Sequence, residues 1–244
     1  MKKKMYVLGV AALVAAMLAL SGVAHSAMWV GAELGGNFPL KTSMDVSAGP
    51  LNGTVSNIAI QPSVMGGAMI GYDFINSGFG GRAWPDWMKY FSFATDITYN
   101  SFNINANQTV GVVLNGVNFG NVTGNRDGYL KGYEVCWTFL FMAHYGFMAD
   151  SEVPSGRINP YIGVGPALLW SGFENPIGGG GVNAMNVALV VEPGIRWMAL
   201  SNVSIDTAMR YRYAAPSYDI ANNVNLTLTP LHQLSFLVRA NYHF

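Results

Sequence analysis

The final twelve residues of the sequence, 233–244, alternate strictly between two sets of side chains. One set is apolar and the other is mostly polar; the apolar set is Leu234, Phe236, Val238, Ala240, Tyr242 and Phe244. Such alternation predicts a β-strand, because successive side chains of a strand point to opposite faces of its sheet. A tilted strand of this length could cross a bilayer, and it could equally be a half-buried edge strand of a soluble sandwich. The remaining segments of the sequence distinguish a membrane strand from a strand of a soluble sandwich.

The N-terminus has the pattern of a secretory signal peptide. Three lysines at positions 2–4 precede an apolar run over 5–20, and small residues follow up to Ala27. We expect residues 1–26 to be removed, with cleavage after Ser26 and Ala24 at the −3 position, although Ala24 or Ala27 could also be the last residue removed. The alternative, an uncleaved membrane helix, needs a slightly longer apolar run. Residues 27–244 are expected to form one domain.

Composition separates this domain from ordinary soluble proteins. Charged residues make up 11% of the chain, against roughly a quarter in soluble globular proteins. Yet after the signal no run of about 18 uncharged apolar residues suggests a membrane helix. The formal net charge of zero argues against a nucleic-acid partner, and the single cysteine, Cys136, cannot form an internal disulfide.

Seven further segments repeat the alternation of the last one. The eight predicted strands are 28–35, 64–74, 91–99, 132–147, 160–170, 185–197, 203–213 and 233–244. Three long connections, 37–62, 100–128 and 214–231, are predicted to be loops. Within the second of them Asn115-Gly116 lies between two short apolar runs, which predicts a type I′ hairpin that stands out of the membrane.

The placement of charge favours a membrane barrel over a soluble sandwich. The apolar faces of the eight predicted strands contain no Asp, Glu, Lys or Arg, whereas the opposite faces hold nearly all the charge of the strands. A sandwich would carry charge on its outer face. In lipid the apolar face points outward and every strand edge has to be paired. The predicted fold is therefore all-β: an eight-stranded, antiparallel, up-and-down transmembrane β-barrel with both ends of the domain in the periplasm.

At this point the sequence resembles the small eight-stranded outer-membrane barrels of the OmpA-like and opacity-protein type. Segments 66–74, 160–165 and 202–213 carry the resemblance, together with the terminal Phe244. It implies a multi-pass protein of the Gram-negative outer membrane, surrounded by lipid and lipopolysaccharide, with surface loops of variable role. It also implies that Phe236, Val238, Tyr242 and Phe244 form a C-terminal signal for the barrel-assembly machinery. We expect a monomer with no further domain after the last strand.

The polar faces predict a charge network inside the barrel. Its expected members are Glu33, Asp96, Glu134, Glu192, Arg196, Asp206, Arg210 and Arg239. Charges in a lumen of this size have to pair, because an isolated buried charge is very costly. We expect Arg239 to pair with Glu33 across the closing seam and Arg210 to pair with Glu192. The rival hypothesis is an ion path lined by the same residues.

The sequence predicts a structural or surface-interaction protein that acts through its long loops and binds an unidentified ligand. The alternatives are a narrow, porin-like pore for ions or small solutes and, less favoured, a lipid A-modifying enzyme. His144, His232 and His243 are scattered, and no nucleophile motif surrounds them. We therefore predict no catalytic residues, no metal site and no cofactor.

Overall fold

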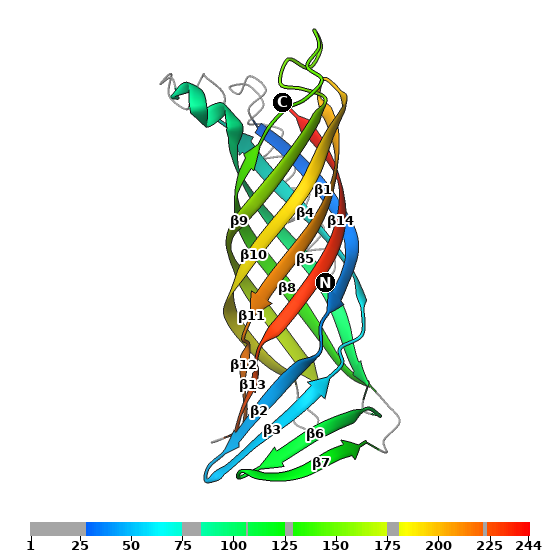
Figure 1. The fold of residues 1–244 in the computed structure, drawn as a ribbon, viewed down its shortest axis with the longest axis vertical. Coiled ribbons are helices and arrows are strands. Elements are labelled where there is room, and N and C mark those ends of the chain that lie inside the picture. The colour runs from blue at the N-terminus through cyan, green and yellow to red at the C-terminus, as the bar shows by residue number, and fades with distance from the viewer. Residues whose placement is uncertain (1–27, 75–83, 106, 125–128, 175–180, 222–223) are drawn as a thin grey trace, which may run out of the picture.

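The computed structural model describes residues 28–74, 84–105, 107–124, 129–174, 181–221 and 224–244; the expected signal peptide lies outside them. Eight strands close into an antiparallel barrel in the order β1-β14-β11-β10-β9-β8-β5-β4 (Figure 1). Their bounds are β1 Met28–Pro39, β4 Ser63–Asp73, β5 Phe91–Asn105, β8 Tyr129–His144, β9 Ile158–Glu174, β10 Gly181–Leu200, β11 Val203–Ala214 and β14 Leu231–His243. The predicted eight-stranded barrel is thus confirmed, and each strand overlaps the segment expected for it.

The barrel closes between its first and last strands. β1 pairs with β14 over eleven residue pairs, which include Glu33 opposite Arg239. One mouth of the barrel holds Met28, His243 and the connections β4–β5, β8–β9 and β10–β11, and we call it the turn end. The opposite mouth, called the sheet end, continues into the long connections (Figure 1).

Alternation along the strands separates an apolar exterior from a mixed interior. Val64, Val187 and Leu34 point outward and are 72%, 69% and 64% exposed. The charged residues described within the barrel strands are buried or half-buried, except Lys131 and Glu174 near the sheet end. An exterior of this kind is stable only when lipid covers it, so the strands belong in a bilayer.

The long connections at the sheet end are folded, contrary to their prediction as loops. They contain six strands: β2 Thr42–Ala48, β3 Leu51–Ile58, β6 Thr109–Leu114, β7 Val117–Thr123, β12 Ser217–Ala221 and β13 Val224–Leu228. These strands form a second sheet in the order β12-β13-β2-β3-β6-β7, which we call the outer sheet. Pairing between different connections, as of β2 with β13, stabilises these short strands.

The predicted hairpin at Asn115-Gly116 is confirmed as β6–β7. Both turn residues have positive φ, 49° and 79°, as a type I′ turn requires. Asn115 also joins this hairpin to the neighbouring one, because its backbone N–H donates to the carbonyl of Asn52 at 2.7 Å and its side-chain oxygen accepts from the Asn52 N–H at 2.9 Å. The β6–β7 hairpin forms one edge of the outer sheet (Figure 1).

Described parts of the connections at the turn end include a short helix before β5 and a turn between β8 and β9. The 3₁₀ helix η3, Asp86–Tyr90, leads directly into β5. Between β8 and β9, the Asp150 carboxylate accepts the backbone N–H groups of Glu152 and Val153 and binds the guanidinium of Arg157. None of the helices within the described ranges is long and apolar enough to cross a bilayer.

Candidate functional site

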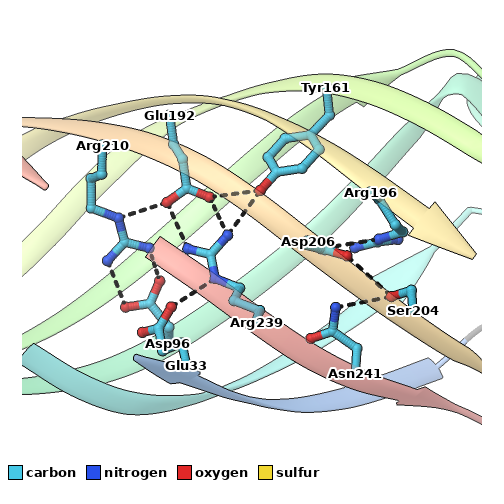
Figure 2. A network of polar contacts seen from close by, with 10 residues as sticks. All are labelled: Glu33, Asp96, Tyr161, Glu192, Arg196, Ser204, Asp206, Arg210, Arg239 and Asn241. Atoms are coloured by element: carbon cyan, nitrogen blue, oxygen red, sulfur yellow. Dashed lines mark hydrogen bonds and ion pairs between the residues drawn. The ribbon is translucent and has the colours of Figure 1, made fainter. Parts of the chain in front are cut away.

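The lumen holds a group of interlocked charges, Glu33, Asp96, Glu192, Arg210 and Arg239, which we call the middle cluster (Figure 2). Arg239 Nε donates to Glu33 Oε2 at 2.7 Å, across the seam between β1 and β14. Arg210 Nε donates to Glu192 Oε2 at 2.6 Å, between β11 and β10. Both expected pairs are present, because each joins side chains of neighbouring strands that point into the lumen.

Glu192 is the centre of the middle cluster. Both of its oxygens accept from Arg239, at 2.6 and 2.8 Å, in addition to the bond from Arg210. Arg210 reaches across the lumen with its other two nitrogens to Asp96, at 3.1 and 2.5 Å. Tyr161 accepts from Arg239 at 2.9 Å and donates to Glu192 at 3.2 Å. Two guanidiniums therefore bind three carboxylates, and these five charged side chains together with Tyr161 span the interior from wall to wall.

Arg196 and Asp206 form a separate group nearer the turn end, although we expected one continuous network (Figure 2). Arg196 Nε donates to Asp206 at 3.2 Å, because the two residues are register partners on β10 and β11. Asp73 lies 3.6 Å from Arg196 Nη1, and the guanidinium stacks on Trp29 at 4.4 Å from the ring centre. The position of Trp29 requires Gly71, since a Cβ there would lie 2.2 Å from the ring.

A third group lies toward the sheet end. Glu134 binds the guanidinium of Arg212, and the side-chain amide of Gln233 donates to the same carboxylate at 2.9 Å. Arg212 was not among the predicted members of the network, although it shares its inward face with Arg210. Gln233 is neutral, so a search for charges alone could not find it.

Apolar side chains lie beyond this third group at the sheet end. The buried cluster contains Phe173, Val182, Tyr218, Leu226 and Leu228. Tyr218 links this cluster to the barrel wall through a 2.7 Å hydrogen bond with Ser171, and its burial raises the pKa of its hydroxyl to about 12. The lumen therefore contains three polar layers of side chains, with this apolar cluster at the sheet end and further apolar side chains, such as Leu140 and Leu237, packed inside the barrel.

The arrangement is suited to filling the lumen and holding the barrel wall together. Each buried charge has an opposite charge within hydrogen-bond distance, which offsets the large cost of burying it. The ion pairs join opposite walls, as in Arg210 with Asp96, as well as neighbouring strands. Such a core differs from a water-filled channel, in which charged side chains would line the wall and face solvent.

The predicted C-terminal signal residues lie on β14 or directly after it. Phe236, Val238 and Tyr242 point to the exterior and are 55%, 55% and 46% exposed. The backbone N–H of Phe244 donates to the carbonyl of Met28 at 3.0 Å. These positions leave the aromatic face of the strand turned toward lipid; its role in assembly stays a prediction.

Two of the three histidines of the domain, His144 and His243, line the same mouth, and His232 lies at the opposite end. His232 contacts Tyr211 through a 2.6 Å hydrogen bond near the sheet end. His243 contacts Ser204 at 3.0 Å near the turn end, and His144 lies in the wall of the same mouth. Among the described residues no group of three or more His, Cys, Asp or Glu side chains could hold a metal ion.

Comparison with known proteins identifies the fold. No protein-family model and no curated protein matches the sequence. Among solved structures, the outer membrane protein OprG from Pseudomonas aeruginosa superposes with a TM-score of 0.50 at 12% identity, over 90% of this chain and 96% of that one. Neisserial surface protein A and Ail, the attachment invasion locus protein of Yersinia pestis, give TM-scores of 0.38 at 18% and 12% identity, over 87% and 89% of this chain and 95% and 99% of theirs.

The chain has the fold of the small eight-stranded outer-membrane β-barrels, as the sequence predicted. The expected outer-membrane location agrees with this fold and with the lipid-facing exterior. The likeness to OprG extends to the fold alone, so the function has to be argued from the residues of this chain.

Proposed function

We propose that this protein is a surface-interaction protein in which a closed barrel anchors the outer sheet outside the cell. On this proposal the turn end faces the periplasm and the sheet end faces the exterior, because outer-membrane barrels have short periplasmic and long external connections. The main observation that supports this proposal is the group of apolar side chains that the β6–β7 hairpin exposes to water. Val117 and Phe119 are each 59% exposed, Val122 is 44% exposed and Leu114 is 41% exposed.

An apolar surface on a water-exposed hairpin is costly unless a partner covers it. Burying the exposed part of Phe119 alone would contribute on the order of 1–2 kcal/mol. The described residues of this hairpin, 109–123, carry no charge, so a partner could bury them without removing a charge from water. These features favour contact with an apolar protein surface over contact with a charged polymer.

The filled lumen favours this proposal over a pore. The middle cluster and the two polar groups on either side of it hold buried ion pairs, and an ion passing through would have to displace them in series. Lipid and lipopolysaccharide around the exterior, and the assembly machinery acting on β14, are part of the same proposal. Contacts with lipid and with the assembly machinery explain the apolar outer faces of the barrel strands, but they do not explain the exposed apolar side chains of the β6–β7 hairpin.

An adhesion assay tests this function. Bacteria that display the intact chain would be compared with cells displaying the double variant Val117→Ser/Phe119→Ser on immobilised extracellular-matrix proteins and on cultured epithelial cells. We expect the intact chain to raise adhesion above that of an empty-vector strain and the double variant to lose most of the gain. Asn121→Ser, a polar exchange on the same strand, is the matched control and should bind as the intact chain does.

The folded state of each variant would be checked by its migration in detergent gels with and without heating. If folded intact protein gives no more adhesion than the empty vector, the proposed function is wrong. Equal adhesion by the intact chain and the folded double variant would show that the hairpin is not the binding surface.

A further inference from the structure

A cavity of about 470 Å³ opens at the turn end, on the opposite side of the filled lumen from the outer sheet. Met142, Val153, Pro154 and Met198 form an apolar part of its wall. Polar side chains from β4, β5, β8, β9, β10 and β14 and from the connections at this end form the remainder, and they include Asp73 and Glu152. This volume is within the range of small-molecule sites. Lys89, on η3, lies at the exposed rim.

Three residues that line this cavity each have a polar side-chain atom with no hydrogen-bond partner among the described residues. These atoms are Arg196 Nη2, Ser92 Oγ and His144 Nε2, and each is buried. Arg196 is only 6% exposed, and Ser92 is fully buried. Buried polar groups of this kind are nearly always hydrogen-bonded in folded proteins, so three unpartnered atoms around one cavity point to something that binds there.

The two carboxylates that line the cavity, Asp73 and Glu152, already have partners. Asp73 accepts from Trp29 Nε1 at 3.2 Å and lies beside Arg196, and Glu152 accepts from Arg157 Nη2 at 2.8 Å. Lys89, by contrast, has no carboxylate within ion-pair distance in the described part of the chain. The groups left over are therefore a guanidinium nitrogen, an ammonium, a hydroxyl and an imidazole nitrogen.

We propose that this cavity binds the oxyanion group, carboxylate or phosphate, of a small solute. Arg196 donates from Nη2, Ser92 donates its hydroxyl proton, and the solute's remaining atoms pack on the apolar wall. A guanidinium held by other contacts is well suited to this task, because its free nitrogen is already oriented. The site is independent of the proposed surface function, since it lies at the other end of the barrel.

Calorimetric titration of the full domain, refolded in lipid nanodiscs, tests the site. Sodium phosphate and sodium succinate are titrated separately, with sodium chloride at equal ionic strength as the blank. We expect saturable binding of at least one oxyanion; saturation by phosphate alone or by succinate alone identifies which group the site takes.

Two variants locate the binding. Ser92→Ala removes one hydrogen bond and should weaken binding about fivefold. Arg196→Lys keeps the charge but loses the planar fork, and should weaken it at least tenfold. Ser171→Ala, the same exchange at a buried serine near the sheet end, is the control and should bind as the unmodified protein does.

The proposal is overturned if the folded protein shows no saturation with either oxyanion in the millimolar range. It is also overturned if Ser92→Ala binds as tightly as the unmodified protein, and that variant decides the matter should Arg196→Lys fail to fold. Heat-dependent gel migration establishes folding in each case.

Discussion

At the scale of single residues, Glu192 determines how the middle cluster is held together. It is fully buried and accepts hydrogen bonds from Arg210 and Arg239, which come from different strands. The parity of each strand placed these side chains inside the barrel, and neighbouring strands suggested which of them would pair. The reach of Arg210 to Asp96 across the lumen could not be predicted, because strand parity does not tell which opposite walls come into contact.

Replacing Glu192 by Gln should destabilise the barrel strongly. The exchange keeps the side-chain shape but leaves two buried guanidiniums without the charge they share, which typically costs about 3–5 kcal/mol. Urea unfolding in lipid vesicles, followed by tryptophan fluorescence, would measure the change in the free energy of unfolding. Glu152→Gln, at an exposed carboxylate, is the control. Equal unfolding midpoints for the two variants would contradict the central role of Glu192.

At the scale of elements, the barrel strands were predictable, whereas the outer sheet was predictable only at its β6–β7 hairpin. Alternation persists along each barrel strand because lipid and lumen impose opposite requirements on its two faces. The outer strands are short and their faces differ less, so their local signal is weak. Their pairing joins connections far apart in the sequence, as β13 with β2, and a single sequence does not specify such partners.

The turn between β8 and β9 should respond to pH through Asp150. The hydrogen bond from Arg157, followed by those of the backbone N–H groups, lowers the pKa of this carboxyl below its ordinary value. The contacts are therefore complete above the ordinary pKa and are lost as the pH falls through the lowered one. In an NMR titration the Val153 amide should shift with a midpoint below about 3.9.

The variant Asp150→Asn should remove this titration and leave the barrel folded. A titration midpoint at or above the ordinary pKa of aspartate would contradict the conclusion that the Asp150 carboxylate holds this turn together.

At the scale of the whole molecule, the layers of the lumen act in series. Opening one of them leaves the others in place, so the intact protein in a planar bilayer should show no discrete conductance steps. The double variant Glu134→Gln/Arg212→Met replaces one buried pair by neutral side chains, which is often tolerated. It should fold and remain non-conducting, because the middle cluster is unchanged. Discrete steps from the folded, intact protein would show instead that ions pass the clusters.

The seam of the barrel continues beyond the membrane. β1 pairs with β14 inside the bilayer, and the strands that follow β1 and precede β14, β2 and β13, pair again in the outer sheet, with Val46 opposite Leu226. The first and last connections thus meet beside the seam at which the ring of strands closes. An antibody raised against the junction of β2 and β13 would therefore recognise finished molecules and ignore partly inserted ones, so that immune recognition at the cell surface would report on the maturation of the protein.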